Sequence, residues 1–160
     1  MSMAADNWIA IEDLPHRLAP GGRLLGLDLG TKTIGLALSD ITFLIATPLA
    51  TIARTKFLND LKILTEYIEN NNVSGLIIGL PLHLDGSEGR SAQSVRAFAR
   101  NLSQTIALPI VFWDERLSTV AVERTLLEAD TSRKRRKEVV DKMAAAFILQ
   151  GALDRLRNIR

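Results

Sequence analysis

The sequence contains no cysteine and no long apolar run, and these two absences exclude several classes of protein. Without cysteine there are no disulfide bonds and no thiolate metal ligands, which suits a reducing cytosol, so we expect a cytoplasmic protein. Residues 41–50 are the most apolar stretch, but threonines and Pro48 interrupt them, and we expect no association with a membrane. Residues 1–22 carry acids and a proline where a signal peptide needs a basic start and an apolar run.

The charge balance is close to neutral, with 20 lysines and arginines against 18 acidic residues. The net charge of +2 does not by itself indicate a polyanionic partner. The 160 residues are 47% apolar, which is enough for one compact domain with a real core. We predict this domain over residues 23–160. Residues 1–22, which end in Pro-Gly-Gly, are predicted to be an N-terminal extension outside the core, with its mobility left open. Within it, Trp8 and Ile9 are expected to dock on the domain rather than on a partner.

Hydrophobic periodicity predicts an α/β fold. Alternating apolar residues indicate an antiparallel meander of three strands, and residues 73–80 are apolar on both faces, as in a buried parallel strand reached by a crossover helix. The predicted strands are residues 23–29, 33–39, 49–54, 73–80 and 109–113, and the predicted helices are residues 56–69, 91–102, 118–128 and 138–156, with a basic loop at 131–137. The expected result is a mixed five-stranded sheet, with three antiparallel strands followed by parallel strands, flanked by helices.

Asp28 is a carboxylate in the first predicted strand, which is otherwise apolar. Removing an unpaired ionised acid from water costs several kcal/mol, so Asp28 should be compensated by a cation or lie at an open rim of the sheet. Gly26 and Gly30 would let a bulky ligand approach the backbone. The alternative is an aspartate that caps the turn of a hairpin.

Three further acids lie at the end of a predicted strand or at the start of a predicted helix. Asp114 and Glu115 follow the last predicted strand, and Asp141 lies in the first turn of the last predicted helix, before three alanines that would let this helix lie near the sheet. Each has a simpler interpretation when taken alone. The first two could be a surface pair with Arg116 as counter-ion, and Asp141 could be an acid favoured by the helix dipole. Their conjunction with Asp28 favours convergence.

Converging carboxylates without histidine or cysteine are hard oxygen ligands that suit Mg²⁺ or Mn²⁺. Two such ions, about 3.5–4 Å apart, form the clamp used in phosphodiester hydrolysis. The basic run directly before Asp141 would supply contacts to the phosphates of a nucleic acid, and its alternative interpretation is a solvated loop. This run consists of Arg133, Lys134, Arg135, Arg136 and Lys137. His83 is interpreted as a polar loop residue rather than a base.

Four segments resemble the YqgF/RuvX family of Holliday junction resolvase-like proteins and pre-16S ribosomal RNA nucleases. They are LGLDLGTKTIGLALSD at 25–40, IIGLPLHLDGSEGRSAQSVRAFA at 77–99, DERLSTVAVERTL at 114–126 and VDKMAAAFILQGALD at 140–154. The resemblance implies a ribonuclease H-like fold and catalytic carboxylates at Asp28, at the Asp114–Glu115 pair with Glu115 favoured as the ligand, and at Asp141. The chain departs from the family pattern at Thr33, where arginine is frequent, and at Arg90, where proline is common.

The resemblance implies an endonuclease dependent on Mg²⁺ or Mn²⁺ that acts on structured RNA, above all at the 5′ end of precursor 16S ribosomal RNA, and leaves a 5′-phosphate and a 3′-hydroxyl. We expect Asp28, Glu115 and Asp141 to hold the metal. The residues expected to contact the substrate are Gly30, Lys32, Asp85, Arg116, Arg133, Lys134, Arg135 and Arg136.

Several alternatives remain open from the sequence. One is a Holliday junction resolvase acting on branched DNA, and another is a non-catalytic nucleic-acid-binding or ribosome-assembly module. A sugar-kinase or actin-like ATPase shares the Asp-Leu-Gly-Thr of residues 28–31, but such proteins need two domains around a nucleotide. A homodimer is also left open.

Overall fold

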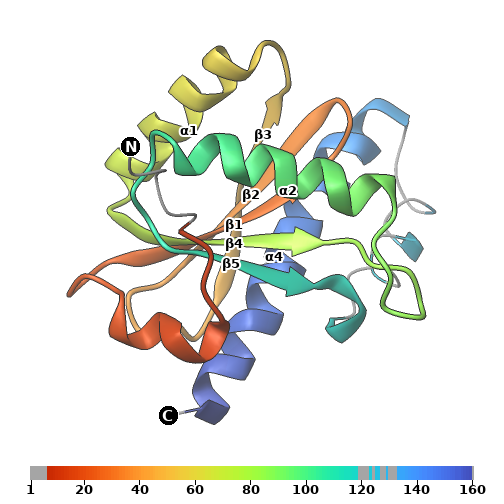
Figure 1. The fold of residues 1–160 in the computed structure, drawn as a ribbon. Coiled ribbons are helices and arrows are strands. Elements are labelled where there is room, and N and C mark those ends of the chain that lie inside the picture. The colour runs from red at the N-terminus through yellow and green to blue at the C-terminus, as the bar shows by residue number, and fades with distance from the viewer. Residues whose placement is uncertain (1–6, 119–122, 124, 127–128, 130–132, 160) are drawn as a thin grey trace.

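The computed structural model describes residues 7–118, 123, 125–126, 129 and 133–159, and for residues 133–139 the backbone alone. Its centre is a five-stranded sheet in the order β3-β2-β1-β4-β5 (Figure 1). Strand β1 (Arg23–Leu29) pairs antiparallel with β2 (Thr33–Ser39), which pairs antiparallel with β3 (Ala46–Ala53). On its other side β1 runs parallel to β4 (Val73–Leu80), and β4 runs parallel to β5 (Ile110–Asp114). The predicted mixed sheet is confirmed.

Helices cover both faces of the sheet (Figure 1). On one face lie α1 (Phe57–Asn70) and α2 (Arg90–Ser103), and on the other lie α4 (Arg133–Ile159) and the short 3₁₀ helix η1 (Ile11–His16). The alternation of side chains along β1 explains the two cores, since Leu25 and Leu27 pack towards α1 and α2 whereas Leu24 packs towards α4. Asp28 has the same parity as Leu24, so its side chain lies on the α4 face.

The N-terminal segment, from Asn7 onwards, is part of the domain, so the prediction of an extension outside the core is wrong for these residues. Leu14 is fully buried against α4. The backbone of residues 7–9 pairs with the edge of β5, since Ile9 donates its N–H to the carbonyl of Ile110, and Ile110 donates to that of Asn7. Trp8 packs edge-on against Phe112, so the predicted docking of Trp8 and Ile9 on the domain is confirmed.

The predicted basic loop is also wrong, because α4 begins at Arg133 and includes residues 133–137. Arginine and lysine are good helix formers, and the basic run continues the helix that follows it. Asp141 therefore lies eight residues after the start of α4 and not in its first turn, so the helix dipole does not explain it.

Other boundaries differ little from the prediction. Strand β3 begins three residues early and includes Pro48, which an edge strand tolerates because its outer N–H needs no partner. The predicted helix at 118–128 lies mostly outside the described residues, although Glu123, Thr125 and Leu126 are helical. Among the helices of the described part of the chain, none has the length and the apolar composition needed to cross a bilayer.

Candidate active site

Asp28 is the buried carboxylate around which the site is built. It lies near the carboxyl end of β1 on the α4 face and is 9% exposed. Its antiparallel partner on β2 is Gly35. Paired residues in neighbouring strands have Cα atoms about 4.5–5.5 Å apart, so whatever contacts Gly35 on this face lies beside Asp28.

Gly35 brings Asp141 to this place. A Cβ atom added at Gly35 would overlap the carbonyl oxygen of Asp141, so α4 crosses β2 directly on this glycine. The hydroxyl of Thr33, two residues earlier on the same face of β2, donates a hydrogen bond to Asp141 Oδ2. The carboxylate of Asp141 therefore lies at the end of β2 where the chain enters from the β1–β2 turn, one strand away from Asp28.

Glu115 approaches from the other side of Asp28. The last recorded pair between β1 and β4 is Leu27 with Ile78, and continuing this register by one residue places Gly79 beside Asp28. A Cβ atom added at Gly79 would lie 3.0 Å from Glu115 Oε2. The carboxylate of Glu115 thus lies over β4, on the face that carries Asp28.

The three carboxylates lie at one end of the sheet, but their oxygens are not arranged to coordinate a common metal ion. Within the ranges that the structure describes, no three histidine, cysteine, aspartate or glutamate side chains are arranged so that they could hold a metal ion. The donor chemistry nevertheless fits Mg²⁺ or Mn²⁺, because it consists of hard oxygens, and Gly35 and Gly79 keep side-chain bulk away from Asp28.

Asp114, although adjacent to Glu115, is not part of this group. Arg116 holds it through Nε to Oδ1 at 3.0 Å and Nη2 to Oδ2 at 2.6 Å. This hydrogen-bonded pairing lowers the pKa of Asp114 and raises the pKa of Arg116. Asp114 is therefore the acid that pairs with Arg116 at the surface, as one interpretation of the sequence expected. The carboxylate of Glu115 lies over the sheet.

Arg116 also fastens the connection between β4 and α2. Its Nη1 donates to the carbonyl of Leu84 at 3.1 Å. Within this connection Asp85 Oδ1 accepts hydrogen bonds from the hydroxyl of Ser87 at 2.6 Å and from its N–H at 2.9 Å, and these bonds lower the pKa of Asp85. Asp85 and Arg116, both predicted to contact the substrate, thus already shape a loop at the edge of the site.

Arg54 is a residue that sequence reasoning missed. Its Nη1 donates to the carbonyl of Gly30 at 2.6 Å, and its own N–H donates to the carbonyl of Lys32 at 2.8 Å. Its guanidinium lies 5.3 Å from the centre of the Phe98 ring. Arg54 therefore fixes the β1–β2 turn that follows Asp28, while the side chain of Lys32 is exposed. Only its position as the last residue of the third predicted strand could have indicated this role.

The four basic residues predicted to bind phosphate lie on the first turns of α4, and their side chains lie outside what the structure describes. They are Arg133, Lys134, Arg135 and Arg136.

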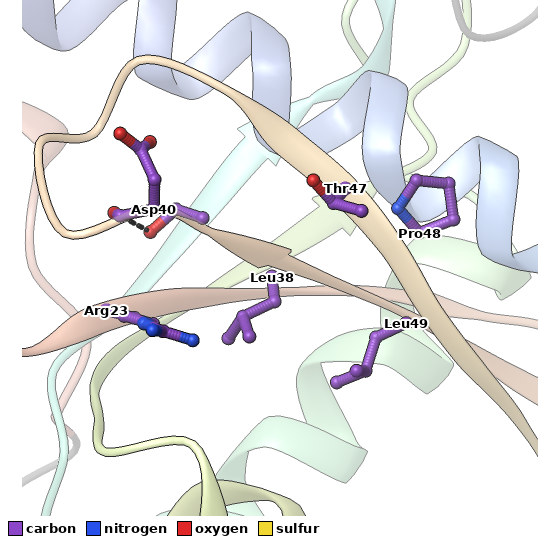
Figure 2. Close-up of a pocket in the computed structure, with 7 residues that line it drawn as sticks. Arg23, Leu38, Asp40, Thr47, Pro48 and Leu49 are labelled. Carbon is purple, nitrogen blue, oxygen red and sulfur yellow. Dashed lines mark hydrogen bonds between the residues drawn. The ribbon is translucent and has the colours of Figure 1, made fainter.

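One hollow lined by described residues lies away from the three acids. It has a volume of about 250 Å³ and is lined by residues at the opposite end of β1, including Arg23, Asp40 and Leu49 (Figure 2). The carboxylate of Asp40 is turned into its own loop, where it accepts hydrogen bonds from Leu44 and Ile45.

The sheet order and the helices on its two faces define a ribonuclease H-like fold. RuvC of Thermus thermophilus superposes with a TM-score of 0.51 at 10% identity, over 84% of this chain and 96% of RuvC. A second structure, T. thermophilus RuvC in complex with a Holliday junction substrate, gives 0.50 at 10% identity, over 79% of this chain and 91% of that one. At this identity the likeness shows the fold alone.

The sequence identifies the family. A family model described as "RuvX: Holliday junction resolvase" matches residues 22–155, and the chain belongs to this family. A protein of Methylocella silvestris is 59% identical over 98% of this chain and 97% of its own length, and one of Ruegeria sp. is 60% identical over 94% and 96%. Both carry the name "Putative pre-16S rRNA nuclease". The family and the names of these relatives make the chain a nuclease, a hydrolase of phosphodiester bonds.

Proposed function

We propose that the chain is a cytoplasmic endonuclease that depends on Mg²⁺ or Mn²⁺ and processes the 5′ end of precursor 16S ribosomal RNA. The observation that carries this proposal is the placement of three acidic side chains from β1, the end of β5 and α4 at one glycine-lined end of the sheet. Sequence positions 28, 115 and 141 are far apart, and hard carboxylate oxygens brought to one end of a sheet suit a divalent cation.

Asp28, Glu115 and Asp141 would hold the metal. Bound there, the ions would activate a water molecule for in-line attack on phosphorus and stabilise the leaving oxygen. The chain's other residues position these ligands. Thr33 orients the carboxylate of Asp141, and Arg54 fixes the turn after Asp28.

The support for an RNA substrate comes from the names of the relatives and from the basic start of α4. Arg136 precedes Asp141 by five residues, which is about 7.5 Å along a helix at 1.5 Å per residue. Phosphates that reach the carboxylates would therefore pass close to the basic turns.

A cleavage assay tests the proposal. Purified full-length chain is incubated with a 5′-extended precursor 16S RNA or with a four-way DNA junction, in Mg²⁺, Mn²⁺ or EDTA. We expect RNA cleavage that requires the cation and falls at least about 100-fold in Asp28→Asn. Asp13→Asn, an exposed aspartate of η1, is the matched control and should retain activity.

The second candidate is a DNA junction resolvase, which the description of the family model favours. Cleavage of the four-way junction without cleavage of the RNA would replace the first proposal with this one. Full complementation by Asp28→Asn in cells that lack the wild-type protein would instead favour a non-catalytic role.

A further inference from the structure

The connection between β4 and α2 is a small hydrogen-bonded hairpin at the edge of the candidate active site. Leu82 and Glu88 form an antiparallel bridge, the N–H of His83 donates to the carbonyl of Ser87 at 3.0 Å, and the N–H of Gly86 donates to the carbonyl of His83 at 2.8 Å. Gly86 has a φ of +88°, a conformation that favours glycine. Figure 1 shows this hairpin beyond the carboxyl end of β4, beside the end of β5.

One ion pair and one hydrogen bond hold the hairpin in place. Glu88 pairs with Arg96 of α2 at 2.6 Å. On the other side Arg116, already bound to Asp114, donates to the carbonyl of Leu84, and a Cβ atom at Gly86 would lie 3.4 Å from Arg116 Nη1. The hairpin is therefore fastened both to α2 and to the segment that carries Glu115.

The tip of this fixed hairpin carries one apolar side chain, Leu84, between the exposed His83 and Asp85. Leu84 is 95% exposed, and Leu117, the residue after Arg116, is 68% exposed. A single exposed leucine needs no explanation by itself, but Leu84 lies on a hairpin that Arg116 fastens to the segment carrying Glu115. Because Arg116 is paired with Asp114, the phosphate of a ligand would be held at the proposed metal ligands and not by this guanidinium. An unstacked nucleotide with its phosphate at that site carries a base whose apolar face would suit Leu84.

We propose that Leu84 contacts the base of an unpaired nucleotide next to the cleaved phosphate, so that the enzyme prefers nucleic acid with a junction between duplex and single strand. This inference rests on the proposed function, and it adds a substrate-binding residue and a substrate class to it. Leu84 would cover the exposed face of the last base of the duplex or of the first unpaired base, as apolar side chains do where they enter a base stack.

The test measures binding of an RNA hairpin with a 5′ single-stranded extension that carries 2-aminopurine at the first unpaired position. The protein carries Asp28→Asn, so the probe stays intact whether or not the chain is a nuclease. We expect fluorescence to rise on binding. Adding Leu84→Ala should abolish this rise and weaken binding about 10-fold, the scale of one buried leucine, while binding of blunt duplex RNA changes less than about 2-fold.

Two variants make the comparison specific. Leu84→Met keeps an apolar side chain of similar size and should restore both the fluorescence rise and the affinity. Ile45→Ala, which removes a 61% exposed apolar side chain between β2 and β3, should change neither.

Each other outcome overturns the inference in a distinguishable way. Leu84→Ala could bind the extended hairpin with the same affinity as the parent, or lose affinity for blunt duplex RNA to the same degree. Either result would show that Leu84 does not distinguish the junction from duplex, and the proposed function would be unaffected. If the parent protein binds none of the RNAs, the inference and the proposed RNA substrate fall together.

Discussion

The neighbouring acids Asp114 and Glu115 have opposite surroundings. Arg116 neutralises Asp114, whereas the carboxylate of Glu115 lies over Gly79 on the face that carries Asp28. We therefore expect Glu115→Gln to reduce cleavage at least about 100-fold, because it removes a proposed metal ligand. Asp114→Asn should reduce it less than about 10-fold, through loosening of Arg116. Cleavage rates in saturating Mn²⁺ check this order, and an inactive Asp114→Asn with an active Glu115→Gln would reverse the assignment.

At the far end of β1, Asp40 provides a test of the fold that is independent of catalysis. Burial opposes ionisation here, but hydrogen bonds from Ile45, Thr42 and Leu44 outweigh it and lower the pKa of Asp40 from 3.8 to about 2. A carboxyl whose pKa is lowered by folding stabilises the protein above its unfolded pKa, and this contribution is lost as the pH falls through the folded value.

We accordingly expect Asp40→Ala to lower the free energy of unfolding by about 1 kcal/mol at pH 7, a value reduced for the partial exposure of the loop. The difference from wild type should shrink between about pH 4 and pH 2. Urea unfolding of both proteins across this range measures it, and a difference that is independent of pH would show that the carboxylate charge is not responsible.

At the scale of elements, the contact between α4 and β2 sets the position of Asp141. Gly35→Ala would place a methyl group on the carbonyl oxygen of Asp141, and backbone cannot move aside as a flexible side chain can. We expect a loss of about 3 kcal/mol in unfolding free energy and a matching loss of Mn²⁺ affinity, as α4 shifts. Thermal unfolding and metal titration check both effects.

The matched control is Gly21→Ala, where a Cβ atom would meet nothing within 4 Å but φ is +73°. It should cost only about 1 kcal/mol and leave Mn²⁺ affinity unchanged. Equal losses of metal affinity in the two variants would mean that general destabilisation, and not the position of α4, is responsible.

The elements differ in how far they could be predicted from the sequence. Strands β1, β2 and β4 have the predicted bounds because their apolar patterns are bordered by glycine, asparagine or polar turns. The start of α4 was missed because a run of basic residues has no apolar periodicity, although it has good helix propensity. The burial of η1 was missed because it depends on the long-range contacts of Leu14.

The candidate site shows the same division. The buried acid Asp28 could be singled out because a charge interrupts an apolar strand. The sequence indicated Arg116 as a counter-ion for the Asp114–Glu115 pair. The position of Glu115 over Gly79 and the hydrogen bond of Arg54 to the Gly30 carbonyl depend on long-range contacts that only the folded chain shows.

At the scale of the whole molecule, the basic start of α4 gives one end of a nearly neutral protein a local positive charge. Replacing both Arg135 and Arg136 with alanine should weaken binding to RNA and DNA alike. It should also reduce the slope of log affinity against log salt by about 1 to 2, since each lost phosphate contact releases about one counterion fewer. Titrations at several salt concentrations measure the slope.

The control removes equal charge from the other end of α4, by replacing Arg155 and Arg157 with alanine. These two form exposed ion pairs with Glu12 and Asp154, which contribute little to stability. An equal change of slope in both double variants would indicate a diffuse effect of net charge and would remove the start of α4 from the interface.

The most direct measurement is a crystal structure of the full chain soaked in Mn²⁺, with the ion located by anomalous scattering. The account predicts Mn²⁺ bound by carboxylate oxygens of Asp28, Glu115 and Asp141, with α4 and the segment after β5 drawn towards the end of β1. Mn²⁺ bound elsewhere, or three carboxylates that stay apart at saturating Mn²⁺, would contradict it.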